Sequence, residues 1–160
     1  MAPQHVENVT QWMKGASRLA HGADEDGPGF MPSCFNSKCV EADEDSAVFE
    51  YTVQKADCNF SGTFHGGAIA TLVDNLSTAA MFTRDRKHFR FGGVSSDLHV
   101  TYVAAAPLGM TVLLKIQVHK VGAGLANLAA VMTDKATGRV LATAAHTKFN
   151  TDSRMGGSKL

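Results

Sequence analysis

The sequence predicts an α+β domain in which an antiparallel sheet wraps around one long central helix. Two strand-like segments within residues 35–54 precede a long apolar segment with helical spacing, at about residues 66–83, and four further strand-like segments follow it. Short turn sequences join the last four segments, which favours antiparallel neighbours. A chain of 160 residues, 44% of them hydrophobic, also has the usual size of one domain with a buried core.

Three parts are predicted along the chain. Residues 1–32 form an N-terminal extension that contains a helix, because apolar residues recur there at helical spacing before the stretch HGADEDGPGFMP interrupts them. Residues 33–150 form the α+β domain, and residues 151–160 form a flexible, glycine-containing tail.

Alternation of apolar and polar residues predicts which strand side chains face the core. For the segments 46–54 and 94–102, the inward residues are predicted to be Ala47, Phe49, Tyr51, Val53, Val94, Leu98, Val100 and Tyr102. Segments 125–133 and 140–149 are apolar on both sides, which predicts strands that are central in the sheet or covered on both faces.

The overall charge and the cysteine pattern exclude several classes of partner. Fifteen Lys and Arg balance fifteen Asp and Glu, so no broad attraction to nucleic acid or to an anionic membrane is expected. No apolar run approaches the roughly 20 residues that span a bilayer. The three cysteines lack the paired spacing of a zinc site, so we expect neither a metal site nor a disulfide framework.

The helical segment contains an aspartate among apolar residues. At about 100° per residue, the apolar face consists of Ile69, Leu72, Val73, Leu76 and Ala80. Asp74 falls on the far flank, beside Ala70, Ser77 and Met81, and that flank does not resemble a solvent-facing surface. Because a desolvated carboxylate without a partner is costly, Asp74 is predicted to be partnered, hydrated or functional. The alternative is an ordinary surface position.

The start of this helix is a candidate oxyanion site. The amides of Gly66 and Gly67 lie in the first turn, where unpaired N–H groups and the positive end of the helix dipole favour developing negative charge. Glycine also lets a carbonyl group approach the backbone closely. The alternative is a glycine-rich loop that simply leads into a helix.

One copy of the helix cannot bring both groups to the same carbon atom. Gly66 and Asp74 are eight residues apart, which is roughly 12 Å along a helix. Two antiparallel copies related by a two-fold axis would set the start of one helix beside the middle of the other. The spacing therefore predicts a site shared between two chains.

Taken together, these segments resemble hotdog-fold acyl-CoA thioesterases of the PaaI-like group. The resemblance rests on HGGAIATLVDNLS, VSSDLHVTY, PLG, DKATGR and HTKF, and it covers about residues 35–150 with the helix and all six strands in order. It implies hydrolysis of fatty acyl-CoA to free fatty acid and CoA, without a cofactor. It also implies a homodimer that assembles to a homotetramer, with the sites at the dimer interface.

The resemblance implies a role for individual residues. Asp74 matches the catalytic carboxylate, which acts as general base on water or as nucleophile, and Ser95 matches the serine that helps to place the water or the aspartate. Asn59 and the Gly66 amide match the donors to the thioester carbonyl, and His65 stands beside them as an orienting residue. A carboxylate and two such donors are sufficient for an activated thioester, so no metal is required.

Further residues are candidates for binding the substrate. Gly67 belongs to the same helix start, and His146 matches a histidine near the site, although an ordinary strand histidine is an equal alternative. Arg90, in the loop after the helix, and Lys120 and Lys148, near strand ends, are candidates for the CoA phosphates. A solvated charged surface is the alternative for these three.

Two other functions remain open at this stage. A hotdog hydratase or dehydratase would need an aspartate and a histidine paired across the α and β carbons of the thioester, and that motif is not seen. A noncatalytic acyl-CoA-binding module would keep the fold, but the joint presence of Asp74, Asn59 and the HGG motif argues against it.

The last three residues predict a cellular address. Ser158, Lys159 and Leu160 match the peroxisomal targeting tripeptide, so we expect recognition by the peroxisomal import receptor. Cytoplasm or mitochondrion are the alternative locations. A fluorescent fusion that stays diffuse in cells with intact peroxisomal import would contradict this prediction.

Overall fold

The structure is a computed structural model that describes residues 4–21 and 36–155. Its elements are α1 (Gln4–His21), β1 (Lys38–Ala42), β2 (Ser46–Thr52), the 3₁₀ helix η1 (Lys55–Asp57), α3 (Gly66–Ala80), β3 (Val94–Tyr102), β4 (Thr111–Val121), β5 (Leu125–Asp134), β6 (Val140–Phe149) and α4 (Asp152–Met155). The predicted boundary between residues 32 and 33 and the C-terminal tripeptide both lie outside the described residues, so they stay predictions. None of the helices within these ranges combines the length and the apolar composition that crossing a bilayer requires.

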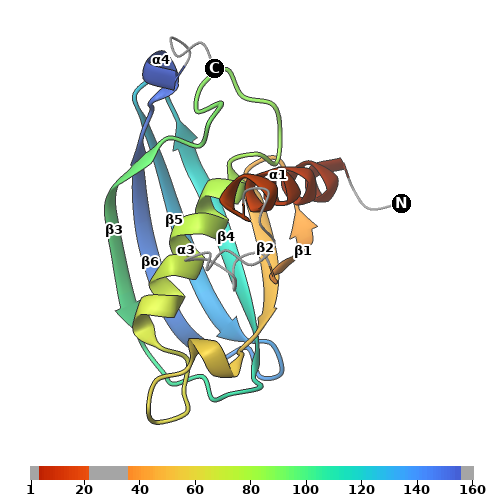
Figure 1. Cartoon of the computed structure of the whole chain (residues 1–160), viewed down its shortest axis with the longest axis vertical. Helices are drawn as coiled ribbons and strands as arrows, with labels where there is room; N and C mark the ends of the chain where they lie inside the picture. The colour runs from red at the N-terminus through yellow and green to blue at the C-terminus, as the bar shows by residue number, and fades with distance from the viewer. Residues whose placement is uncertain (1–3, 22–35, 156–160) are drawn as a thin grey trace.

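The six strands form one antiparallel sheet that curves around α3 (Figure 1). The strand order is β1-β2-β4-β5-β6-β3, and every neighbouring pair is antiparallel. β3 follows α3 in the chain but pairs with β6 at the far edge, so α3 crosses the sheet between β2 and β3. The predicted α+β class and the helix wrapped by a sheet are confirmed, which is the hotdog arrangement that the resemblance implied.

The core lies between α3 and the concave face of the sheet. All four predicted inward residues of β2 and its extension, Ala47, Phe49, Tyr51 and Val53, are buried. The predicted apolar face of α3 is buried as well, and it consists of Ile69, Leu72, Val73, Leu76 and Ala80. α1 covers one end of this core by burying Val6, Val9 and Met13 against β1 and α3.

One expectation about the strands differs from the structure, and another is confirmed. Val94 and Tyr102 were expected to face inward, but they are 51% and 52% exposed, because β3 is an edge strand that pairs only with β6. β5 and β6 were expected to be central or covered on both faces. Both strands are central, because each has a neighbouring strand on either side. Leu125 of β5 and Phe149 of β6 are nevertheless exposed, because no element of the described chain covers the outer face of the sheet.

The central helix ends three residues earlier than predicted. α3 stops at Ala80 because the chain tightens into i→i+3 hydrogen bonds, in which the amides of Met81 and Phe82 bond to the carbonyls of Thr78 and Ala79. The Arg86 side chain then donates from Nε to the Met81 carbonyl at 2.8 Å, which caps the end of the helix.

The loop after α3 is tied to the rest of the domain at both ends. Arg84 and Arg86 form ion pairs with Asp45 in the turn between β1 and β2. Asp152 of α4 accepts hydrogen bonds from the amides of Arg90 and Phe91. The first part of the predicted tail is therefore a helical turn that docks on this loop, while residues 156–160 lie outside the described part of the chain.

Candidate active site

Asp74 is partnered rather than an isolated surface carboxylate. Its side chain is 40% exposed, and Oδ1 accepts a hydrogen bond from the Ser95 hydroxyl at 2.6 Å. Two more polar groups lie beyond this contact, at 3.4 Å for His146 Nε2 and 3.8 Å for Lys148 Nζ. We name the four side chains Asp74, Ser95, His146 and Lys148 the Asp74 cluster. One face of it is polar and buried, and the other is open to solvent.

A β-bulge in β3 makes the cluster possible. On β6, His146 and Lys148 are two residues apart and therefore share a face. Their partners across the strand pair are Leu98 and Ser95, which are three residues apart and would face opposite ways in a regular strand. The shift in register between Ser95 and Asp97 inserts one extra residue, and this turns Ser95 to the side on which α3 lies.

His146 is a buried and uncharged member of the cluster. Its side chain is 1% exposed, and Nε2 lies 3.0 Å from Ser95 Oγ. The pKa of His146 is lowered from 6.5 to about 4, chiefly by burial and also by the charge of Lys148, while the charges of Asp74 and Asp97 oppose the shift. At neutral pH the contact with Asp74 therefore involves a neutral imidazole.

Lys148 is a buried member of the Asp74 cluster. Its side chain is 4% exposed, and Nζ lies 3.4 Å from Ser95 Oγ. Burial lowers the pKa of Lys148, and the negative charge of Asp74 opposes this shift. Lys148 therefore lies beside the carboxylate in the single chain, and its contact with a CoA phosphate stays a prediction. The other two predicted phosphate ligands, Arg90 and Lys120, are exposed and are not members of the Asp74 cluster.

The start of α3 includes an amide, that of Gly66, without a partner in the described chain. His65 is the N-cap, and its Nδ1 accepts a hydrogen bond from the Gly67 amide at 2.9 Å. The predicted substrate contact of Gly67 is therefore occupied by a contact within the chain. The Gly66 amide makes no hydrogen bond to another described residue, while the Gly66 carbonyl accepts the Tyr102 hydroxyl at 2.8 Å. The first-turn amide of Gly66 is free to bind a developing oxyanion.

Asn59 is turned into its own loop in the single chain. Its Oδ1 accepts hydrogen bonds from the amides of Ser61 at 2.9 Å and Thr63 at 3.2 Å, and its Nδ2 donates to Thr63 Oγ1 at 2.9 Å. The loop is fixed from outside by the bond between the Phe64 amide and the Ala106 carbonyl. Asn59 therefore lies in the loop that leads into α3, and part of its amide is already engaged there.

The predicted site residues form two groups rather than one. Ser95, His146 and Lys148 gather at Asp74, whereas Asn59, His65 and Gly66 gather at the start of α3. The eight residues between Gly66 and Asp74 correspond to roughly 12 Å of one regular helix.

Sequence analysis did not predict the contacts of two further buried polar groups, Asp57 and Ser77. Asp57 accepts hydrogen bonds from the Tyr51 hydroxyl and the Gln54 amide, and its carbonyl accepts the His65 amide. It thereby holds the loop that leads into α3. Ser77 contacts His146 Nδ1 at 2.6 Å. Its place on the Asp74 flank of the helix was visible in the sequence, but its partner on β6 was not.

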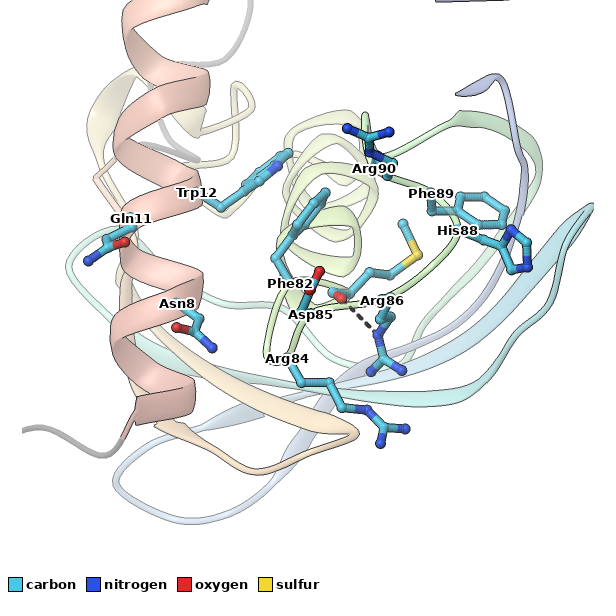
Figure 2. A pocket seen from close by; sticks show the side chains of 11 residues that line it. Asn8, Gln11, Trp12, Phe82, Arg84, Asp85, Arg86, His88, Phe89 and Arg90 are labelled. Atoms are coloured by element: carbon cyan, nitrogen blue, oxygen red, sulfur yellow. Dashed lines mark hydrogen bonds between the residues drawn. The ribbon is translucent and has the colours of Figure 1, made fainter. Parts of the chain in front are cut away.

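A cavity beside the end of α3 is separate from both groups. About 430 Å³ of space lies between α1 and the loop after α3, where the rings of Trp12 and Phe82 stack at 4.9 Å (Figure 2). Arg84 and Arg86 line this cavity, but their charges are already paired with Glu44 and Asp45. None of the four residues of the Asp74 cluster lines it. Within the described ranges, no group of three or more His, Cys, Asp or Glu side chains is placed to hold a metal ion.

Known proteins share both the sequence and the fold. Residues 61–141 match the thioesterase superfamily. Over 109 residues the chain is 39% identical to human acyl-coenzyme A thioesterase 13, a match that covers 68% of this chain and 76% of the human protein. The crystal structure of zebrafish thioesterase superfamily member 2 superposes with a TM-score of 0.75 at 35% identity, covering 90% of this chain and 96% of that one.

A more distant neighbour shares the fold alone. The structure of E. coli PaaI matches with a TM-score of 0.65 at 18% identity, over 93% of this chain and 99% of that chain. The resemblance drawn from the sequence is thus confirmed at two levels, by the relatives and by the fold. The chain belongs to the thioesterase superfamily and has its hotdog fold.

Proposed function

We propose that this protein is an acyl-CoA thioesterase that hydrolyses fatty acyl-CoA to free fatty acid and CoA. The observation that carries the proposal is the Asp74 cluster, in which a half-exposed carboxylate is held by Ser95 with one side open to solvent. The name of the human relative, acyl-coenzyme A thioesterase 13, supports the substrate class. That the acyl group is a fatty acyl chain is what the sequence resemblance implies.

The proposed chemistry needs a base and an oxyanion site. Asp74 removes a proton from water, and the resulting hydroxide attacks the thioester carbonyl carbon. The carbonyl oxygen becomes an oxyanion that accepts a hydrogen bond from the free Gly66 amide, with Asn59 as a second donor. The C–S bond then breaks, the acyl group leaves as a carboxylic acid, and the CoA sulfur receives a proton. Direct attack by Asp74, followed by hydrolysis of the anhydride, is the alternative route.

The two halves of the site come from two chains in this proposal. Asp74 of one chain acts with Gly66 and Asn59 of a second copy, because one helix separates its own Gly66 and Asp74 by roughly 12 Å. An antiparallel pair of α3 helices brings the two groups together across a two-fold axis. The exposed edge strand β3 supports this arrangement, since its unpaired side is available to another chain.

The test is release of free thiol from short, medium and long acyl-CoAs by the wild type and by Asp74→Asn. Loss of the positioned base lowers kcat by about 100-fold or more, while the amide keeps the shape of the side chain. The acyl-CoA that the wild type turns over fastest identifies the preferred chain length. Binding of acyl-CoA by both proteins without hydrolysis by either would contradict the proposal and indicate a binding module.

A further inference from the structure

The Ser77 hydroxyl contacts the His146 ring on the side away from Ser95. Ser77 Oγ lies 2.6 Å from Nδ1, and Ser95 Oγ lies 3.0 Å from Nε2. Ser77 is 1% exposed, so water does not compete for this contact. The imidazole is therefore held between two hydroxyl groups, one from α3 and one from β3.

The proton of the Ser77 hydroxyl has two acceptors within reach. One is His146 Nδ1, and the other is the Asp74 carbonyl at 3.0 Å. That carbonyl already receives the Thr78 amide through the regular i→i−4 bond of the helix, and it also receives the Thr78 hydroxyl at 2.9 Å. Because a carbonyl oxygen has two lone pairs, the Ser77 hydroxyl would be a third donor there. The closer ring nitrogen is the better acceptor.

The other end of the cluster requires the same arrangement of protons. The 2.6 Å contact between Ser95 and Asp74 uses the Ser95 proton, because an ionised carboxylate only accepts hydrogen bonds. Ser95 Oγ must then accept from His146 Nε2. A neutral imidazole carries one N–H, and here that proton is on Nε2. Nδ1 is therefore the unprotonated nitrogen that accepts a hydrogen bond from Ser77.

From this geometry we propose that Ser77 is a positioning residue, which fixes the Nε2–H tautomer of His146 and so directs the Ser95 proton to Asp74. The hydrogen bonds then run in one direction, from Ser77 through His146 and Ser95 to the carboxylate. In the opposite tautomer a bare Nε2 would face Asp74 Oδ1 at 3.4 Å and compete for the Ser95 proton. The effect of Ser77 on rate rests on the proposed function, whereas its effect on the tautomer does not.

Burial keeps the imidazole in the neutral state that this role requires. The pKa of His146 is lowered to about 4, chiefly by burial, so the ring carries a single N–H across the neutral range. A protonated ring would donate from both nitrogens and would need no partner to select a tautomer.

The direct test is the ¹⁵N NMR spectrum of the imidazole groups at pH 7. The His146 signals are assigned by their absence in His146→Gln, and protonated and bare ring nitrogens differ clearly in chemical shift. We expect the wild type to carry its proton on Nε2, and Ser77→Ala to show a mixture of tautomers, because Nδ1 has lost its donor. A wild-type proton on Nδ1, or an unchanged tautomer in Ser77→Ala, would overturn the proposal.

Activity provides the second test. Ser77→Ala should lower kcat by about tenfold or more with little change in KM, which is part of the rate enhancement that a positioned base supplies. Ser77→Thr should restore kcat, because it returns the hydroxyl group. Thr83→Val is the matched control, because it deletes another buried hydroxyl, whose 2.8 Å bond to the Glu44 carbonyl is remote from His146.

The outcomes separate the two proposals. A folded Ser77→Ala protein with wild-type kcat, or an equal loss of kcat in Thr83→Val, contradicts the positioning role. If the wild type hydrolyses no acyl-CoA at all, the proposed function fails, and the NMR spectra alone decide the tautomer.

Discussion

A neutral imidazole in the interior makes the stability of this protein depend on pH. In the folded chain the pKa of His146 is lowered to about 4 by burial. In the unfolded chain the ring is hydrated and its pKa returns to about 6.5. Below pH 6.5 the unfolded state therefore binds a proton that the folded state does not bind. The free energy of unfolding consequently falls as the pH falls from about 6.5 to about 4.

Replacement of His146 by glutamine should remove this dependence. Between pH 7 and pH 4 we expect the wild type to lose about 3 kcal/mol more of its free energy of unfolding than His146→Gln, because each unit of pKa shift corresponds to about 1.4 kcal/mol. Urea unfolding curves at one-unit steps of pH measure the difference. The contribution of the carboxylates is common to both proteins and cancels in the comparison. Parallel pH profiles of the wild type and His146→Gln would contradict the lowered pKa of the buried ring.

Single residues of the site were predictable to different degrees. Asp74 is visible in the sequence because a helical pattern fixes the face of each residue from its neighbours. The contact of Ser77 with His146 joins residues 69 positions apart, so it depends on how α3 meets β6. The position of Lys148 depends on the one-residue bulge beside Ser95, which period-two alternation does not reveal.

At the scale of elements, the loop between α3 and β3 depends on backbone conformations that glycine permits. Gly92 and Gly93 have φ of 79° and 65°, in the left-handed region. A Cβ on Gly93 would also lie 2.4 Å from the Phe149 carbonyl oxygen and 2.8 Å from the Phe89 ring. Gly93 is therefore required both for its φ and for the close approach of the end of β6, and it sets where β3 begins.

Gly93→Ala should destabilise the fold by about 3 kcal/mol, from left-handed strain plus the clash with the backbone. The matched control is Gly138→Ala in the turn between β5 and β6, where φ is 73° but no atom lies within 4 Å of the added Cβ. We expect the control to lose only about 1 kcal/mol, from φ alone. Thermal unfolding compares the two variants, and equal losses would refute the close-approach argument.

The elements themselves were largely predictable, and their ends and exposures were not. Alternation identified β2 and helical spacing identified α3, because burial on one face leaves a periodic signal. The end of α3 at Ala80 depends on a cap from Arg86, which is specific to the folded loop. The exposure of β3 reflects its place at the sheet edge, and alternation does not distinguish an edge strand from a central one.

At the scale of the whole molecule, the shared site can be tested by mixing two inactive variants. Asp74→Asn removes the base, and Gly66→Pro removes the unpaired Gly66 amide. Proline is tolerated at the first position of a helix, and His65 before it already has an extended backbone, with φ of −66° and ψ of 135°. In a mixed dimer, one of the two sites combines the intact Asp74 of one chain with the intact Gly66 of the other.

Refolding the two variants together at equal concentration should restore about a quarter of the wild-type activity, because half of the dimers are mixed and each has one intact site. Thiol release before and after co-refolding measures this recovery. Gly66→Ala serves as control, because it adds a Cβ near the Tyr102 ring and retains the amide N–H. No recovery on mixing, while Gly66→Ala stays active, would exclude a site divided between chains.

The architecture was more predictable than the assembly. The six strands and one long helix each leave a local pattern, and the motifs of the resemblance give their order. The dimer, the tetramer and peroxisomal import depend on surfaces of other molecules, so they stay predictions.

The stacked ring of Trp12 also makes the N-terminal helix optically visible. Trp12 is the only tryptophan in the chain, and it packs on Phe82 where α1 meets the loop after α3. Intrinsic fluorescence therefore reports the docking of α1, whereas far-ultraviolet circular dichroism follows the sheet and all the helices together. If α1 belongs to the cooperative unit, the two signals change together during unfolding, and if α1 detaches first, the fluorescence changes earlier.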